Sequence, residues 1–570
     1  MTDRRLKHWG WGYEDQQRSP AEVERAAAGI REMLGFGGEV VPPVGLDAAT
    51  MPDARLAVPG TGTAGLFSDD RHDRAVHALG KSYRDVVRGH RGEFPNPPDL
   101  VARPAGEAEV LEVLERAADW GAAVIPFGGG TSVVGGVEPL LADDSMRSIS
   151  LDMTGLDRVL EIDPVSLGAR IQAGVRGPGL EDQLREHGLT LRHYPQSFEY
   201  STLGGWIVTR AGGHFATGET HIDDLVESVR ALTPRGEWES RRLPGSGAGP
   251  SPDRLLLGSE GILGVVTEAW MRVRPRPRFK AAATVEFPEF AAAATGAVRA
   301  IAQSRLGPSN CRLIDPLEAM TTGAGDGSAT LLLLGFESAA LPVGERLDQT
   351  IGLATDHGGR VASRRVSEPD DRPPGDPGAD RPGSGPAGSG PAGTAAGSDR
   401  WRDAFLLAPY LRDTFVSCGV LSETFETAIT WDRFERFHDA VSRATRDAVA
   451  GVCGVAPDGP GAPRVSCRLT HVYPDGAAPY FTVLAPAVRG GEIEQWAEIK
   501  QAASEAIIDG GGTITHHHAV GRDHRPWYDR QRPEPFAAAL RAAKGEVDPD
   551  GLLNPGVLID PPGVDPGGTV

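Results

Sequence analysis

Cysteine is scarce in this chain of 570 residues. The four that occur are spread along the second half of the chain without a C-x-x-C pair: Cys311, Cys418, Cys453 and Cys467. This pattern excludes a zinc ribbon and a disulfide-framed secreted domain. It fits reduced thiols that are buried as small apolar side chains.

Long apolar runs are missing as well. No stretch approaches the roughly 18 consecutive apolar residues that a membrane-spanning helix needs. The start of the chain, MTDRRLKHWGWGYED, lacks the apolar core of a signal peptide. The sequence therefore predicts a soluble, cytoplasmic protein. Contact with a membrane surface stays open, because a peripheral protein can collect a lipid substrate without any spanning segment.

Positive charge is in deficit. The 78 acidic residues exceed the 58 basic ones and give a formal net charge of -20. Such a charge repels nucleic acid and anionic surfaces at long range, so no nucleic acid partner is expected. For a chain of this length, the usual size of domains predicts about three to four of them.

Lysine is absent from the most informative stretch, AAVIPFGGGTSVVGG at residues 122–136, where an apolar strand runs into a glycine loop. A Walker loop requires a lysine, and the G-x-G-x-x-G fingerprint is broken at its second glycine, so both motifs are excluded. The amides of Gly128, Gly129 and Gly130 can still converge on phosphate oxygens, while Thr131 and Ser132 add hydroxyl donors. Taken alone, the loop fits either a surface turn or a diphosphate cradle.

Apolar spacing divides the chain into successive units. Helical periodicity over residues 21–34 and 73–87 predicts a helical N-terminal segment over residues 1–93. A helix over 107–120 leads into a strand over 122–127 and belongs to an α+β unit over residues 94–278. The further elements predicted in this unit are strands over 148–151, 158–162, 169–173, 226–232 and 265–274, and a helix over 180–186.

A second α+β unit follows over residues 279–547. Its predicted strands are 282–285, 329–334 and 480–484, and its predicted helices are 291–303 and 433–449. Residues 367–398, with GSGPAGSGPAG at their centre, cannot bury enough apolar surface to order themselves, so they are predicted to form a flexible surface insert. The turn-rich end of the chain, residues 548–570, is expected to dock on the body.

Three consecutive histidines, His516, His517 and His518, are the most conspicuous polar side chains. In extended backbone His516 and His518 face one way and His517 the other. No Cys, Asp or Glu stands at metal-ligand spacing here apart from Asp523 near His524, so no metal is assigned. A solvated strand end and a catalytic role both remain open, since imidazoles titrate near neutrality and can carry protons or hold an anionic group.

Tyr480 and the candidate arginines have ordinary structural explanations on composition alone. Tyr480, in APYFTVLAP, fits a core aromatic in a strand. Arg312, Arg412 and Arg468 fit solvated surface side chains. A guanidinium can also hold phosphate or carboxylate through two parallel hydrogen bonds.

Several separated stretches resemble the vanillyl-alcohol oxidase type of FAD-binding flavoproteins, and most closely its ether-lipid-forming branch. In the flavin-binding part these stretches are KHWGWGYED, PFGGGTSV, QSFEYSTLGGWIVTRAGG and LLLGSEGILGVVTEA. Beyond it they are NCRLIDP, YLRD, SETFETAITWDR, the Tyr480 strand and THHHAVG. The resemblance implies an α+β fold in which a two-subdomain FAD-binding unit carries an α+β cap domain for the substrate. FAD would be held non-covalently, because the glycine loop contains no histidine.

The resemblance also implies which residues contact FAD. They are Pro126, Phe127, Gly128, Gly129, Gly130, Thr131, Ser132, Gln196, Ser197, Ser201, Thr202, Thr209, Arg210, Ala211, Gly212, Glu260, Gly261, Ile262, Leu263, Gly264, Val265 and Val266. The sequence departs from the family at Gln196, where an aspartate is usual, and at His214 and Phe215. The change at Gln196 alters the charge beside the cofactor without removing a hydrogen-bonding group.

The activity that the resemblance implies exchanges the acyl chain of acyl-dihydroxyacetone phosphate for a long-chain alcohol, without net redox change. Tyr480 would carry protons, the histidine triple would support the departing carboxylate, Arg412 would bind the phosphate, and Arg312 would assist near the flavin. A small lipid substrate and a homodimer are expected. A 2-hydroxy acid dehydrogenase or oxidase of the lactate or glycolate type is the alternative, because it shares the flavin unit. A flavin-binding protein without chemistry is disfavoured, because the candidate catalytic residues are all present.

Overall fold

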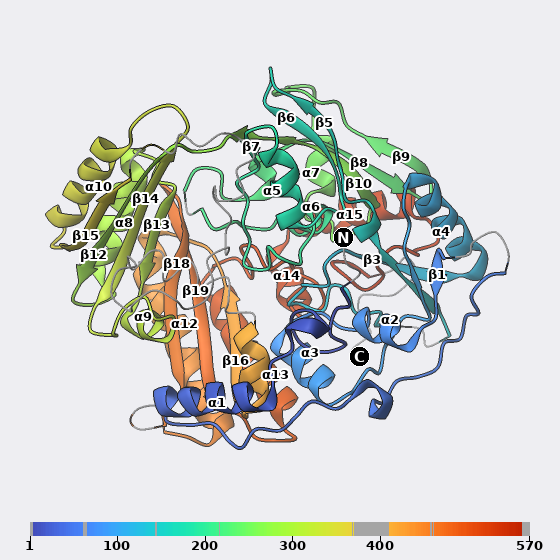
Figure 1. Cartoon of the computed structure of the whole chain (residues 1–570), viewed down its shortest axis with the longest axis horizontal. Helices are drawn as coiled ribbons and strands as arrows, with labels where there is room; N and C mark the ends of the chain where they lie inside the picture. The colour runs from blue at the N-terminus through green and yellow to red at the C-terminus, as the bar shows by residue number, and fades with distance from the viewer. Residues whose placement is uncertain are drawn as a thin grey trace.

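The computed structural model describes residues 4–60, 65–142, 145–215, 217–367, 369, 410–456, 459 and 461–560. Figure 1 shows a large sheet on one side of the molecule and two smaller sheets, joined by helices, on the other. The predicted insert 367–398 lies outside the described residues except for Ser367 and Pro369. No helix in the described part of the chain is long and apolar enough to cross a membrane.

The first small sheet has four strands in the order β1-β2-β4-β3. Its strands are β1 (Phe67–Ser68), β2 (Leu100–Ala102), β3 (Ala122–Phe127) and β4 (Arg147–Asp152). Helix α4 (Glu107–Trp120) ends at Gly121, which adopts the left-handed conformation that glycine tolerates, and β3 begins at the next residue. The helix, strand and glycine loop therefore follow one another as predicted.

The second small sheet has five antiparallel strands in the order β5-β6-β10-β8-β9. They are β5 (Val159–Asp163), β6 (Gly168–Gln172), β8 (Val226–Thr233), β9 (Gly236–Glu239) and β10 (Val265–Arg272). A short pair, β7 (Leu189–Thr190) and β11 (Arg274–Pro275), and helices α5 (Gly177–Arg185), α6 (Leu203–Thr209) and α7 (Pro252–Leu256) complete this part. Leu232 and Val265 of this sheet share a hydrophobic core with Val124 of the first sheet, so the two sheets form one unit with two subdomains, as predicted.

The large sheet has eight strands, ordered β15-β12-β14-β13-β18-β19-β16 with β17 paired to β19. They are β12 (Phe279–Phe287), β13 (Asn310–Ile314), β14 (Thr330–Ser338), β15 (Arg360–Val366), β16 (Val420–Glu426), β17 (Ile429–Thr430), β18 (Arg464–Val472) and β19 (Gly476–Pro486). Its helices are α8 (Ala292–Ser304), α9 (Pro316–Thr321), α10 (Gly344–Asp356), α12 (Trp431–Cys453) and α13 (Glu492–Asp509). Because α8, α10, α12 and α13 bury their apolar sides against one core with the strands, polar side chains gather on the opposite face.

The N-terminal segment spans both halves of the molecule. Helix α1 (Pro20–Leu34) packs on β16 through Ile30 and Leu34. The prediction of one helix over residues 73–87 is wrong, because α2 (Arg71–Val76) and α3 (Tyr83–His90) are separate. The break lies at Gly80, where an added Cβ would stand 2.4 Å from the Ser132 carbonyl oxygen. The glycine loop therefore interrupts the helical pattern from about fifty residues away.

The end of the chain returns to the first sheet. After α14 (Arg525–Gln531) and α15 (Glu534–Val547), residues 548–560 run beside β3. The Val124 amide donates to the Leu552 carbonyl at 2.8 Å, and the Asn554 amide donates to the Val124 carbonyl at 2.9 Å. This contact places Asn554 beside the strand that leads into the glycine loop.

Candidate functional site

A large cavity separates the polar face of the eight-stranded sheet from the glycine loop. The glycine loop, the start of α6 and the turn before β10 form one wall, and strands β13, β16, β18 and β19 form the other. The wall residues from the sheet side are Arg312, Ser422, Thr424, Arg468, Thr470, His471, Tyr480, Thr482 and Leu484, together with Arg412, His517 and His518 from neighbouring segments.

The glycine loop can be built only from glycine. A Cβ on Gly129 would lie 2.0 Å from the Tyr200 carbonyl oxygen, and one on Gly128 would lie 2.2 Å from the Thr202 hydroxyl oxygen. Gly130 has a φ of +64°, which side chains rarely adopt. Among the described residues, the amides of Gly129, Gly130, Thr131 and Ser132 donate to no protein acceptor. A run of free amides facing a cavity fits a diphosphate.

Most of the residues predicted to contact the cofactor line this cavity. The lining includes Pro126, Phe127, Gly128, Gly129, Gly130, Thr131, Ser132, Gln196, Ser197, Ser201, Thr202, Thr209, Ala211, Gly212, Glu260, Gly261, Gly264, Val265 and Val266. Arg210, Ile262 and Leu263 do not line it. The Arg210 side chain turns toward Asp223, at 2.7 Å, whereas Ile262 and Leu263 are buried in the core of the five-stranded part.

Glu260 joins the cofactor side of the cavity to the histidine segment. Its carboxylate accepts hydrogen bonds from the Val520 and Gly521 amides, and its carbonyl accepts one from Asn554 Nδ2 at 2.7 Å. Burial raises the pKa of Glu260 to about 7, against the effect of the two amides. Glu260 therefore ties the turn before β10 to the segment that follows the histidine triple.

Tyr480 stands in the centre of the opposite wall. It is 4% exposed and lies opposite Arg468 on β18 and Glu426 on β16 in the antiparallel register. The Arg468 guanidinium carbon is 3.8 Å from the centre of the tyrosine ring. Burial raises the pKa of the Tyr480 phenol, although Arg468 and a hydrogen bond with Thr424 oppose the shift. The resting phenol is therefore neutral. Its cationic neighbour is Arg468, and the rings of His517 and His518 also lie beside it, with centroids 6.2 and 5.5 Å from that of Tyr480.

A buried carboxylate organises the histidine triple. Glu426 accepts hydrogen bonds from the amides of all three histidines, at 2.7, 3.0 and 2.9 Å, and its side chain is 3.3 Å from His517 Nδ1. Burial acts to raise the pKa of Glu426, but the facing His517 and His518 outweigh it and hold that pKa well below its usual range. Glu426 therefore stays ionised and fixes the turn that carries the imidazoles.

The three imidazoles occupy different positions relative to the cavity. His517 and His518 line the cavity, but His516 does not. His516 lies behind them, where its Nδ1 is 3.1 Å from His517 Nδ1 and its Nε2 is 2.6 Å from the Tyr473 hydroxyl. Burial lowers the pKa of His516 and His518 well below the usual value, so both are neutral near pH 7. A hydrogen-bonded chain thus leads from the cavity wall through His516 to Tyr473.

Two further histidines that the sequence analysis missed complete this cluster. His471 on β18 lines the cavity, and His221 Nε2 is 3.1 Å from His516 Nε2. His471, His516 and His517 bring ring nitrogens within 4.8 Å of one another, which the sequence analysis did not foresee when it assigned no metal. Burial is the main cause that lowers the pKa of His471, and the nearby Arg312 adds to it, so a divalent cation would meet a positive neighbour.

The arginines form the cationic part of the wall. Arg468 pairs with the buried carboxylate of Glu318. Arg312 is 1% exposed and donates to the His214 carbonyl at 3.0 Å. Arg412 donates to the Lys81 carbonyl at 2.8 Å and lies 3.5 Å from the Thr424 hydroxyl. Because a guanidinium carries five N–H groups, Arg412 keeps donors for an anionic ligand.

The role of Glu426 predicts the behaviour of Glu426→Gln. Glu426 raises the pKa of His516 and His518, so its loss should lower both and move the acid limb of the activity profile to lower pH. An amide facing several N–H donors should also cost about 1–3 kcal/mol of unfolding free energy. Glu286→Gln on β12, outside the cavity, is the matched control. If the acid limb of the pH–activity profile stays at the same pH, the proposed effect of Glu426 on the two histidine pKa values is contradicted.

Comparison with known sequence families identifies both halves of the molecule. The FAD binding domain family matches residues 98–240, and the family of C-terminal domains of FAD linked oxidases matches residues 276–372 and 380–558. These matches cover the glycine loop, the eight-stranded sheet and the histidine segment. FAD is therefore the cofactor for which the free amides of the glycine loop are suited.

Comparison with characterised proteins gives a narrower result. The chain is 31% identical over 502 residues to the alkyldihydroxyacetonephosphate synthase of Dictyostelium discoideum, covering 86% of this chain and 78% of that protein. The mitochondrial D-lactate dehydrogenase [cytochrome] of Arabidopsis thaliana is 23% identical over 475 residues, covering 82% and 74%. A solved structure of an alkyldihydroxyacetonephosphate synthase superposes with a TM-score of 0.76 at 23% identity, covering 96% of this chain and 97% of that one, which shows the fold.

Proposed function

Since this chain belongs to the alkyldihydroxyacetonephosphate synthase family, we propose that it exchanges the acyl chain of acyl-dihydroxyacetone phosphate for a long-chain alcohol. The observation that carries the proposal is the placement of Arg412, Tyr480 and the paired His517 and His518 on one wall, facing the glycine loop across the cavity. These residues would supply an anion-binding group, a proton carrier and two imidazoles around one cavity.

FAD, when bound, supplies the reactive centre that allows the two chains to be exchanged without net redox change. The amides of the loop at Gly129, Gly130, Thr131 and Ser132 would hold its diphosphate. The close packing of this loop on Tyr200 and Thr202 keeps those amides aligned before the cofactor arrives. The chain itself must then bind the phosphate, handle protons and keep water away from the exchange.

Arg412 is suited to bind the substrate phosphate. Its two protein contacts fix the guanidinium between the N-terminal segment and β16, while its remaining N–H groups face the cavity. Bidentate binding of a phosphate by arginine orients the substrate as well as holding it. Arg312, which lines the same cavity, would add positive charge to this wall.

Tyr480 is suited to give and take back a proton. Its phenol begins neutral, because burial raises its pKa, so it can act first as a proton donor. The Arg468 guanidinium over the ring stabilises the phenolate that remains. Thr424, which contacts both Tyr480 and Arg412, links the proton carrier to the phosphate group.

The histidines are suited to the second half of the exchange. The bond from the sugar carbon to the acyl oxygen breaks and the fatty acid leaves as a carboxylate, while a new bond forms to the alcohol oxygen. The alcohol must lose its hydroxyl proton, and neutral His518 at the cavity wall can accept it, with the ring of His517 beside it. From His517 the proton can pass to His516 and Tyr473.

The phosphate assignment predicts the kinetics of Arg412→Met. The Michaelis constant for acyl-dihydroxyacetone phosphate should rise by about 10- to 100-fold, as expected for the loss of a charge-assisted pair. Arg412→Lys keeps the positive charge but loses the two parallel N–H donors of the guanidinium. Its Michaelis constant should lie between those of wild type and Arg412→Met. An acyl-dihydroxyacetone without phosphate should react equally well with all three proteins. Equal losses on both substrates would contradict phosphate binding by Arg412.

Incubation of the purified protein with acyl-dihydroxyacetone phosphate and labelled hexadecanol tests the proposed activity. The expected products are a labelled ether, alkyl-dihydroxyacetone phosphate, and one free fatty acid for each ether formed. Omission of either substrate should abolish the ether. Release of fatty acid without ether would mean that the protein only hydrolyses the ester, and the proposal would fail.

A further inference from the structure

The segment between α2 and α3 brings a lysine to the glycine loop from elsewhere in the sequence. The Lys81 amide donates to the Ser132 carbonyl at 2.6 Å, at the end of the loop. Gly80 packs against the same carbonyl, with no room for a side chain. The loop sequence contains no lysine. The fold therefore supplies from the N-terminal segment a residue type that the loop itself lacks.

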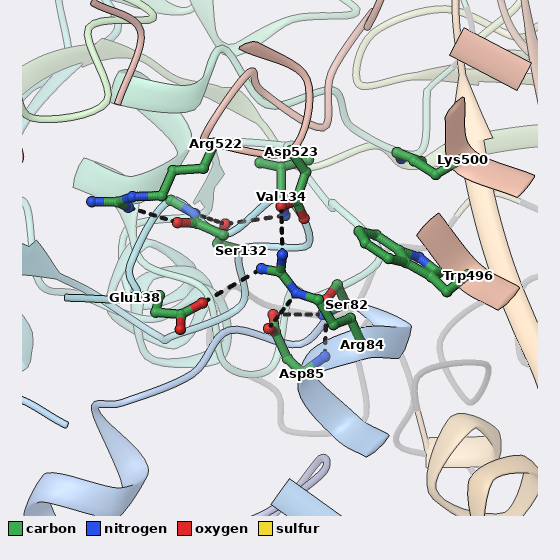
Figure 2. A network of polar contacts seen from close by, with 12 residues as sticks. Ser82, Arg84, Asp85, Ser132, Val134, Glu138, Trp496, Lys500, Arg522 and Asp523 are labelled. Carbon is green, nitrogen blue, oxygen red and sulfur yellow. Dashed lines mark hydrogen bonds and ion pairs between the residues drawn. The ribbon is translucent and has the colours of Figure 1, made fainter. Parts of the chain in front are cut away.

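Buried charges clamp this segment in place, as Figure 2 shows. Ser82 caps the N-terminus of α3 and shares hydrogen bonds with Asp85. Arg84 lies 3.0 Å from Asp523 and 3.4 Å from Glu138. The amides of Arg522 and Asp523 donate to the Val134 carbonyl, two residues after the loop. The segment before α3 and the segment after the histidine triple thus meet at the end of the glycine loop, and Lys81 has a fixed backbone position.

The Lys81 side chain lies beside the glycine loop. It lines a small cavity together with Gly129, Gly130 and Thr131, which also line the large cavity. In the described part of the chain its ammonium group makes no hydrogen bond or ion pair. The nearby carboxylate of Asp413 is occupied by Lys7, at 2.7 Å, and by the Trp11 amide.

The charges around the Lys81 ammonium group favour binding of an anionic ligand. Burial lowers the pKa of Lys81 to about 8, with Asp413 and Asp85 opposing the shift and Lys7 adding to it. Lys81 is half-buried. A partly desolvated ammonium without a partner is costly, and a diphosphate beside it would restore the balance of charge. The loop amides donate hydrogen bonds but carry no net charge. A cation beside them would supply the positive charge that balances a diphosphate.

We propose that the Lys81 ammonium group is a cationic ligand of the FAD diphosphate, delivered to the glycine loop by the N-terminal segment. The inference rests on FAD binding by this chain and not on its synthase activity. A protein that holds FAD tightly and forms no ether would therefore leave this inference standing while removing the proposed function.

Lys81→Met and Lys81→Arg form the test. The first keeps the length of the apolar stem and removes the charge, and the second keeps the charge. FAD release from diluted holoenzyme, followed by flavin fluorescence, should give a dissociation constant about 10- to 100-fold higher for Lys81→Met. Lys81→Arg should stay within about threefold of wild type. Binding of riboflavin, which has no diphosphate, should be equal in all three proteins. Unchanged FAD affinity in Lys81→Met, or equal weakening of FAD and riboflavin, would overturn the proposal.

The wild-type protein provides a second test that needs no variant. The diphosphate binds the protonated lysine, so FAD affinity should be constant below pH 8 and fall as the pH rises above the pKa of Lys81, which is about 8 in the free site. The charged groups that face this ammonium are Lys7, Asp85 and Asp413. The dissociation constant should rise by up to about tenfold per pH unit, and that of riboflavin should not. A flat FAD profile between pH 7 and 9 would overturn the proposal even if Lys81→Met did not fold.

Discussion

Replacement of Tyr480 by phenylalanine is expected to leave FAD bound and to lower turnover by at least about a hundredfold, the usual scale of acid–base catalysis. The substitution removes one hydroxyl group from a buried ring and keeps the packing under Arg468. FAD content follows from the visible absorbance of the purified variant, and turnover follows from the formation of labelled ether. The two readouts separate a chemical defect from a loss of cofactor.

The control for this substitution is Tyr528→Phe. Tyr528 lies on α14, packs against the core of the five-stranded part and does not line the cavity. It should keep both FAD and full turnover. Retention of activity by Tyr480→Phe would mean that Tyr480 is a core aromatic, which is the explanation that composition alone favours.

Replacement of Gly129 by alanine is expected to abolish FAD binding, with a dissociation constant raised by more than about a hundredfold. The new Cβ would stand 2.0 Å from the Tyr200 carbonyl oxygen, which belongs to backbone and cannot rotate away. The loop must then shift, and its amides lose their alignment on the diphosphate. FAD content after purification and titration of the apoprotein with FAD measure the effect.

Gly352→Ala is the matched control for Gly129→Ala. Gly352 lies inside α10, and no atom stands within 4 Å of an added Cβ. Alanine there should keep FAD and stabilise the helix slightly, by about 0.5–1 kcal/mol. Tight FAD binding by Gly129→Ala would show that the loop does not form the diphosphate cradle.

The local spacing of apolar residues predicts the helix and strand before the glycine loop correctly. It fails where segments that are far apart in the sequence come into contact. The helix over 107–120 and the strand over 122–127 have the predicted bounds, because their apolar spacing and Gly121 decide them locally. The helix expected over 73–87 is broken at Gly80 by contact with Ser132, a constraint that no local pattern contains.

The candidate site shows the same division. Tyr480 and Arg412 were identified through the family resemblance, and both line the cavity. His471, Glu426 and Lys81 were missed, since each acts through a partner far away in the sequence. A usable signal did exist for part of this set: Ser422, Thr424 and Glu426 stand at every second position along β16, so the three polar side chains share one face of the strand. A row of polar residues on one face of a buried strand indicates a lined cavity.

The alternative activity, oxidation of a 2-hydroxy acid, uses the same fold. The chain is 31% identical to an alkyldihydroxyacetonephosphate synthase and 23% identical to a D-lactate dehydrogenase, and these comparisons favour the synthase. Homodimer formation and contact with a membrane surface remain predictions. Neither affects the assignment of the cavity residues.

Anaerobic incubation of the holoenzyme with acyl-dihydroxyacetone phosphate and labelled hexadecanol, with no electron acceptor present, tests the central claim most directly. An exchange without net redox change should continue over many turnovers, with equal amounts of ether and fatty acid and no lasting bleaching of the flavin. In parallel samples D-lactate and L-lactate should leave the flavin oxidised. Bleaching of the flavin by a hydroxy acid, together with the absence of labelled ether, would contradict the account.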